Sequence, residues 1–147
     1  VDASRIALDE ARDIALLKAE MTGQGITLTS RQAPPVGLHA CAIGNPFGLG
    51  HSFSCGVVSA TGRKAGFQAI EDFIQTDAAI NPGMSGGALV DAKGQLIGLI
   101  NAIYTKEADI DAGVNFAISS DLLLKGLARL SKAFCSQTGE GMLTPCP

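Results

Sequence analysis

Short apolar stretches, separated by glycine, proline and polar residues, recur along most of this chain. Their apolar residues alternate with polar ones or run continuously for a few positions, which is typical of β-strands. Turn-forming groups such as Asn45-Pro46 and residues 92–94 indicate tight connections between them. The predicted strands are residues 4–10, 14–19, 39–44, 52–60, 73–77, 88–91, 96–102 and 114–118.

No long helical pattern interrupts the stretch from residue 37 to residue 120. Its six predicted strands fit one closed antiparallel β-barrel, so the expected fold class is all-β. A helix is expected to follow over residues 121–134, with Ser120 or Asp121 as its N-terminal cap. The apolar face of this helix is formed by Leu123, Leu127, Leu130 and Phe134.

The composition limits the classes of function. The chain has 147 residues, of which 46% are hydrophobic and 18 are glycine, which suits one domain with a buried core and many tight turns. Its net charge of −3 lacks the basic surface of a nucleic-acid-binding protein, so no nucleic-acid partner is expected. No apolar run approaches the roughly 18 residues that span a bilayer, and residues 1–5 lack the pattern of a signal peptide.

Residues 81–90, NPGMSGGALV, carry the strongest chemical signal in the chain. Ser85 lies between glycines on a tight turn, directly before an apolar strand. A serine acts as a nucleophile only where its hydroxyl is exposed, a base reaches it and backbone N–H groups face the developing oxyanion. The neighbouring glycines suit that geometry, because glycine tolerates unusual dihedral angles. For the pentapeptide alone, a glycine-serine turn without chemistry competes with this interpretation.

The same pentapeptide also fits the nucleophile elbow of α/β-hydrolases, which places a helix after the serine and a histidine further downstream. Here residues 88–100 predict a strand, a turn and a second strand instead. Both histidines, His39 and His51, precede Ser85. The chain order therefore excludes the α/β-hydrolase interpretation.

Four further blocks accompany the serine turn. They are RDIALLK at residues 12–18, AIGNPFGLG at 42–50, GVVSATGR at 56–63 and FIQTDAAIN at 73–81. Together these blocks closely resemble the HtrA (Deg) family of trypsin-like serine proteases, from about Asp9 to about Leu130.

The resemblance implies a trypsin-like antiparallel β-barrel fold with a C-terminal helix. It also implies an extracytoplasmic setting, usually the bacterial periplasm, and a serine endopeptidase that acts on unfolded or misfolded proteins as a homo-oligomer, by resemblance a trimer. No cofactor is expected. The implied organisation is a remnant of a first barrel at residues 1–20, a linker at 21–36, a complete second barrel at 37–120, and a helix and tail at 121–147.

By the same resemblance, Ser85 is the nucleophile and Asp13 is the aspartate that orients the catalytic histidine. The backbone N–H groups of Gly83 and Ser85 form the oxyanion hole. The uncharged pocket for the substrate side chain favours small aliphatic residues, since a lysine or arginine there finds no counter-ion. The walls of this pocket are expected to be Ala79, Ile80, Ile100, Asn101, Ala102 and Phe116.

The histidine of the His-Asp-Ser catalytic triad is not found at its expected place in the sequence. The trypsin-like order is His, Asp, Ser, but no histidine precedes Asp13 in this sequence. We interpret the chain as the C-terminal part of a protease whose catalytic histidine lies in a missing N-terminal segment, so that the chain alone is inactive. The alternative is a non-catalytic, protease-derived module that binds peptides or proteins.

The cysteines leave several possibilities open. In a hairpin centred on residue 48, Cys41 faces Cys55, and His39 faces Val57 rather than His51. A zinc site of two histidines and two thiols is less favoured than buried thiols or a cross-strand disulfide, so no metal is expected. Cys135 and Cys146 can close a loop in the tail or remain free thiols.

Overall fold

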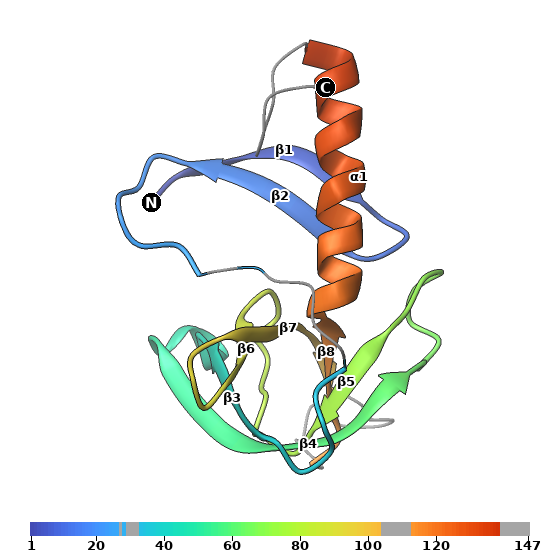
Figure 1. Ribbon diagram of the computed structural model, residues 1–147. Helices are drawn as coiled ribbons and strands as arrows, with labels where there is room; N and C mark the ends of the chain where they lie inside the picture. Colours follow the sequence, from blue (N-terminus) through green and yellow to red (C-terminus); the bar gives the residue numbers. More distant parts are fainter. Residues whose placement is uncertain (27, 29–32, 104–112, 139–147) are drawn as a thin grey trace.

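The computed structural model describes residues 1–26, 28, 33–103 and 113–138 (Figure 1). These residues form a closed barrel, a separate two-stranded ribbon and a long helix that rises from the barrel beside the ribbon (Figure 1). No helix in these ranges is long and apolar enough to cross a membrane.

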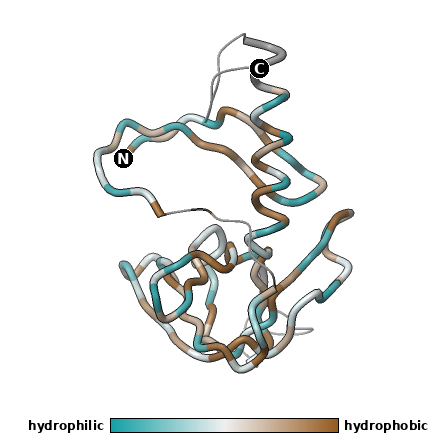
Figure 2. Tube along the Cα trace, viewed as in Figure 1, coloured by the Kyte–Doolittle hydropathy of each residue, from teal (hydrophilic) through white to brown (hydrophobic). Residues whose placement is uncertain are grey.

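The barrel contains six antiparallel strands, as the sequence predicts. They follow one another around the barrel in the order β3-β4-β5-β8-β7-β6, and β6 closes the ring by pairing with β3. Hydrophobic and more polar stretches alternate along the trace of the barrel (Figure 2). The strands are β3 (His39–Gly44), β4 (Ser52–Arg63), β5 (Phe73–Thr76), β6 (Ala88–Asp91), β7 (Leu96–Ile103) and β8 (Asn115–Ser119).

Small side chains fill the centre of this narrow barrel together with branched ones. Ala40, Ala42 and Ala117 are fully buried there, packed in one cluster with larger residues such as Leu89 and Ile100. Such a mixture of small and large residues suits a six-stranded barrel, whose interior has room only for side chains.

The ribbon consists of β1 (Ala3–Asp9) and β2 (Ile14–Ala19), paired antiparallel and outside the barrel. The sequence predicts that Ile14, Leu16 and Leu17 stay exposed unless further strands cover them. That prediction is wrong for Ile14, which is 1% exposed, and correct for Leu17, which is 57% exposed, while Leu16 is half-buried. The difference arises because Ile14 packs against the helix, where a Cβ added at Gly126 would lie 2.7 Å from Cδ1 of Ile14.

The helix, α1 (Ser120–Thr138), starts one residue earlier than predicted and runs further. Its N-terminal cap is Ser119 and not the predicted Ser120 or Asp121, because the Ser119 hydroxyl accepts a hydrogen bond from the N–H of Leu122 at 3.1 Å. Leu123 and Leu130 are buried as predicted. The side chain of Phe134 and the tail from residue 139 lie outside the described residues.

The bounds of five strands differ from the prediction. Three differ by one residue: β1 is shifted to Ala3–Asp9, β5 ends at Thr76 and β7 ends at Ile103. Strand β4 continues to Arg63 rather than ending at residue 60, and its irregular pairing with β5 accommodates the extra residues. Strand β8 is shifted by one residue and ends at Ser119. A short 3₁₀ turn, η1 (Pro46–Gly48), lies between β3 and β4.

Candidate active site

Ser85 lies exposed on a turn that is fixed from both sides. Inside the turn, the N–H of Met84 donates to the carbonyl of Asn81 at 3.1 Å. Beyond it, the N–H of Gly86 donates to the carbonyl of Ile100, and the N–H of Ile100 donates to the carbonyl of Gly87, both at 2.8 Å. These two bonds attach the serine turn to β7, so the position of the hydroxyl is set by the barrel wall.

Two glycines of the turn are required by close backbone contacts. Gly83 has a φ of +96°, and a Cβ there would lie 2.5 Å from the carbonyl oxygen of Asn45. A Cβ on Gly87 would collide with the carbonyl oxygen of Ile43. A side chain at either position would therefore displace the turn, which explains the glycine spacing around Ser85.

Met84, the residue before the serine, is part of the barrel interior. It is 2% exposed and belongs to the central apolar cluster. Its side chain lies over Gly44, where a Cβ would come within 3.0 Å of it. The methionine therefore anchors the turn in the core while its neighbour Ser85 stays at the surface.

Gly83 and Ser85 are the residues whose backbone N–H groups are predicted to form an oxyanion hole. Within the described part of the chain, neither N–H group donates a hydrogen bond to a protein acceptor. Both donors are thus free to face a carbonyl oxygen of a bound substrate, as this type of catalysis requires.

Asn101 on β7 connects the serine to an aspartate from the ribbon. The hydroxyl of Ser85 donates to the carbonyl oxygen of Asn101 at 3.1 Å. The side-chain amide of Asn101 donates to Oδ2 of Asp13 at 2.8 Å. The barrel and the ribbon therefore bring together two residues that the sequence separates widely.

Asp13 ends the turn between β1 and β2, where its φ is 55°. The aspartate before this turn, Asp9, is buried and pairs with Arg12 at 2.8 Å. Asp9 thus holds the turn together, and Asp13 presents its carboxylate to the serine site.

The loop of residues 64–71 also connects the barrel with the ribbon. Its Gln68 donates from Nε2 to Oδ1 of Asn101 at 3.5 Å, and the N–H of Ile70 donates to the carbonyl of Ala11 at 2.9 Å. The sequence predicts neither this contact nor the role of Asn101 as a bridge, because nothing in local spacing reports on contacts between distant segments.

Glu71 organises that loop. Its carboxylate accepts hydrogen bonds from the backbone N–H groups of residues 65, 66, 67 and 68. Burial acts to raise the pKa of Glu71, but the four N–H donors outweigh it and hold the pKa below the ordinary value of 4.5. The ionised carboxylate is therefore the form that shapes the loop.

The residues predicted to line the substrate pocket lie in different surroundings. Ile80 and Ile100 are buried in the central cluster of the barrel, whereas Ala79 is exposed. Phe116 packs with Phe67 and Phe73, at ring distances of 6.1 and 5.7 Å. Ala102 is in β7, but its side chain is outside the described ones. The three described cavities are lined by other residues, so the pocket stays a prediction.

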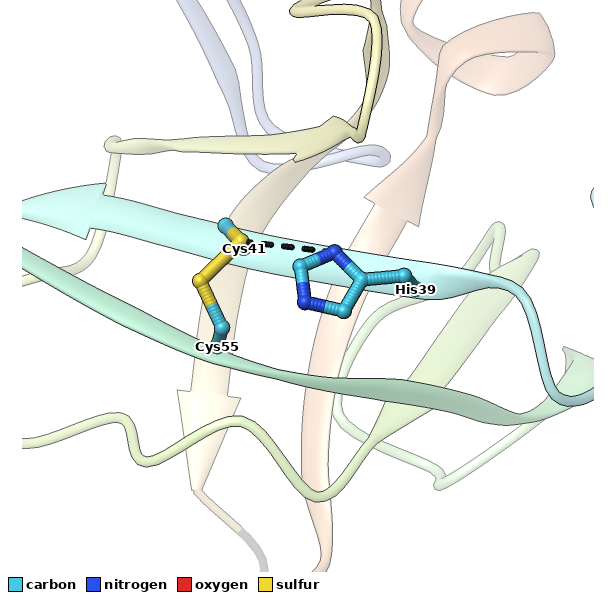
Figure 3. Close-up of side chains that lie close together, drawn as sticks. All are labelled: His39, Cys41 and Cys55. Atoms are coloured by element: carbon cyan, nitrogen blue, oxygen red, sulfur yellow. Dashed lines mark hydrogen bonds between the residues drawn. A yellow bond between two sulfur atoms is a disulfide. The ribbon is translucent and has the colours of Figure 1, made fainter.

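The histidines and cysteines of the β3–β4 hairpin lie as the predicted register places them. Cys41 faces Cys55 and His39 faces Val57, and the two cysteines form a disulfide (Figure 3). Of the two favoured alternatives, the structure therefore has the cross-strand disulfide and not two buried free thiols. Neither His39 nor His51 hydrogen-bonds to Ser85 or Asp13 within the described residues.

Comparison with known proteins agrees with this geometry. The family model of the trypsin-like peptidase domain matches residues 1–99, which is most of the chain and includes both Asp13 and Ser85. The match therefore extends across the ribbon and the first strands of the barrel.

Named relatives are bacterial proteases. The periplasmic serine endoprotease DegP of Escherichia coli K12 is 44% identical over 126 residues, which cover 83% of this chain and 26% of DegP. The periplasmic pH-dependent serine endoprotease DegQ of the same organism is 43% identical over 124 residues, covering 82% of this chain and 27% of DegQ. The chain thus spans about a quarter of the length of these relatives.

A solved structure gives the same result. The HtrA-type protease AlgW with a decapeptide superposes with a TM-score of 0.82 at 45% identity, over 87% of this chain and 40% of AlgW. The resemblance to HtrA proteases and the all-β, trypsin-like fold class are both confirmed. The chain belongs to the trypsin-like peptidase family, and its relatives within that family are HtrA-type serine proteases.

Proposed function

We propose that this chain carries the nucleophilic serine and the histidine-orienting aspartate of an HtrA-type serine endopeptidase. One observation supports this most strongly: Ser85 and Asp13 are held on either side of Asn101 by hydrogen bonds of 3.1 and 2.8 Å. In a serine protease, a histidine between these two groups takes the proton of the serine hydroxyl, and the aspartate stabilises the imidazolium.

In the proposed reaction, Ser85 attacks the peptide carbonyl and the histidine takes the serine proton. For this, the Ser85 hydroxyl leaves the carbonyl oxygen of Asn101 and donates to the histidine instead. The histidine then gives this proton to the leaving amine as the peptide bond breaks, and water hydrolyses the acyl-enzyme that remains. The N–H groups of Gly83 and Ser85 stabilise the oxyanion, and the loss of one such donor typically costs about 10²–10³ in kcat. Oδ2 of Asp13 continues to accept the hydrogen bond from the Asn101 amide, and Oδ1 of Asp13 accepts a hydrogen bond from the histidine.

The histidine is proposed to come from outside residues 1–147. His39 forms its contact with Cys41 on β3, and His51 follows η1 on the same hairpin. This chain alone is then expected to retain only the residual rate of the oxyanion hole and substrate binding, roughly 10³–10⁴ over water.

The proposed substrates are unfolded proteins, cleaved after small aliphatic residues. The support is that none of the predicted pocket residues is charged. In a substrate protein, small aliphatic side chains are normally buried and become accessible when the protein unfolds. Because the named relatives are periplasmic, we also propose a periplasmic location, and a homo-oligomer as the resemblance implies.

The test is a hybrid in which the upstream segment of E. coli DegP precedes Val1 of this chain. The hybrid is expected to cleave unfolded casein, and a peptide library is expected to show preference for valine or alanine at the cleaved position. Ser85→Ala should lower kcat on the order of 10⁶-fold. Cleavage that survives Ser85→Ala would contradict the proposal, and a preference for lysine or arginine would contradict the pocket.

The second candidate is a non-catalytic binding module. It is favoured by the observation that Ser85 donates to a carbonyl rather than to a histidine in the described residues. An inactive but folded hybrid that still binds unfolded casein would favour this candidate over the enzyme.

A further inference from the structure

Three ligand atoms suited to a metal ion gather on one face of the β3–β4 hairpin. Cys41 and Cys55 are opposite each other in the strand register, and His39 lies two residues before Cys41 (Figure 3). Residues two apart on a strand point to the same face, so the register alone places His39 beside the sulfur atoms. The histidine nitrogen and both sulfur atoms lie within 4.8 Å of one another.

The spacing of these atoms is close to that of a tetrahedral zinc site. Zinc binds sulfur at about 2.3 Å and imidazole nitrogen at about 2.05 Å, so that neighbouring sulfur and nitrogen ligands lie about 3.6 Å apart. In the structure, Nδ1 of His39 lies 3.8 Å from Sγ of Cys41. The two sulfur atoms are bonded to each other and would have to separate to about 3.8 Å, which the exposed side chain of Cys55 can achieve by rotation.

We propose that His39, Cys41 and Cys55 form a Zn²⁺ site when the disulfide is reduced. Two thiolates and one imidazole are a donor set that zinc uses with an open fourth position, which water fills. His39 and Cys55 are exposed whereas Cys41 is buried, so the ion would lie at the surface with its open position toward solvent. The hairpin would then be cross-linked by the disulfide in the oxidised protein and by the metal in the reduced protein.

The chemistry of the exchange balances. A dithiol is oxidised to its own disulfide and supplies two electrons and two protons, so that the Cys41–Cys55 bond breaks and two thiols form. In vitro a phosphine does the same: it becomes a phosphine oxide, and one water molecule supplies the oxygen and both protons. Zn²⁺ then binds both sulfur atoms, and the two thiol protons are released to solvent. No other redox partner is required, because the zinc ion does not change its oxidation state.

The experiment uses the full chain with Cys135→Ser and Cys146→Ser, so that no other thiol contributes. After reduction with a phosphine, Zn²⁺ alone is titrated against a chromogenic chelator, and Co²⁺ is used to record thiolate-to-metal charge-transfer absorption. The expected result is one equivalent of metal for the reduced chain, with proton release, and none for the oxidised chain or for Cys55→Ser.

His39→Ala and His51→Ala form the matched pair, since both histidines are exposed residues of the same hairpin. Loss of even an outer partner of a metal ligand costs roughly 10–100-fold in affinity, so His39→Ala should weaken binding at least that much, while His51→Ala should not. Absence of binding by the reduced chain overturns the proposal. Equal affinities for the two histidine variants also overturn it, including when reduction loosens the fold, because unfolded thiols bind metal without regard to His39.

Discussion

The barrel and the ribbon obtain their stability in different ways. Every barrel strand has two hydrogen-bonded neighbours, and the sheet closes on itself. In the described residues, β1 and β2 pair only with each other, and most of their side chains are at least partly exposed. A lone pair of strands is at best marginally stable in water, so the ribbon depends on helix α1 and on contacts with the barrel.

This difference matters for the proposed chemistry, since each region contributes one of the two proposed catalytic groups. The barrel provides Ser85 on a turn with little freedom, while the ribbon provides Asp13 on a turn with fewer supports. Among the described residues, two hydrogen bonds hold the ribbon turn to the barrel and its β4–β5 loop: the Asn101 amide to Asp13 and the Ile70 N–H to the Ala11 carbonyl. The contrast predicts that some changes in the ribbon abolish activity without loss of stability.

The largest expected effect is that of Asp13→Asn in the active hybrid. The isosteric amide cannot stabilise a histidinium, so kcat should fall by about 10⁴, which corresponds to about 5 kcal/mol of transition-state stabilisation. Because Asp13 is exposed, the melting temperature should change little. Glu10→Gln, an exposed acid in the same turn, is the control and should keep nearly full activity. A similar loss in both variants would show that the turn, not the carboxylate, is being disturbed.

The next prediction compares a leucine-to-alanine substitution in the barrel with one in the ribbon. Leu89 is 0% exposed in the barrel, whereas Leu17 is 57% exposed in the ribbon. Leu89→Ala should lower the free energy of unfolding by about 2–5 kcal/mol, because it leaves a cavity. Leu17→Ala should change it by no more than about 0.5 kcal/mol. Urea unfolding measures both. Equal losses would mean that the ribbon is packed as tightly as the barrel.

The same contrast explains what could be predicted from the sequence. The barrel and its hairpin register follow from local alternation and a centred turn, so the pairing of Cys41 with Cys55 is predictable. The burial of Ile14 is not, because it depends on a helix more than a hundred residues later in the chain, at Gly126. The link between Asn101 and Asp13 likewise spans 88 residues, and no periodicity reports it. The one-residue error at the helix start reflects adjacent serines, Ser119 and Ser120, of which either can act as a cap.

The disulfide gives a smaller and more local effect. It joins Cys41 and Cys55 across 14 positions of the barrel sequence, and the described ribbon has no such cross-link. Closing a loop of about this length stabilises a protein by about 3 kcal/mol through the unfolded state. Cys41→Ser/Cys55→Ser should lower the free energy of unfolding by up to that amount, measured in urea. An unchanged unfolding midpoint under oxidising conditions would contradict a stabilising role.

The smallest expected effect concerns Glu71, which shapes the loop that reaches from the barrel to the ribbon. Its folded pKa lies below 4.5, because four backbone N–H donors outweigh the effect of burial. The stability from this carboxylate is therefore fully present above pH 4.5 and is lost as the pH falls through the lower folded pKa. Glutamine has one acceptor oxygen in place of two, so Glu71→Gln should cost about 1 kcal/mol at pH 7.

The measurement is urea unfolding of both proteins from pH 7 to pH 3, with Glu20→Gln, an exposed acid after β2, as the control. The difference between the wild type and Glu71→Gln should shrink toward pH 3, since the protonated carboxyl also loses acceptor capacity. In the active hybrid, the loosened loop should lower kcat a few-fold, because Gln68 and Ile70 then hold Asn101 and the ribbon turn less firmly. A difference that stays constant over this pH range would show that the ionised carboxylate does not support the loop.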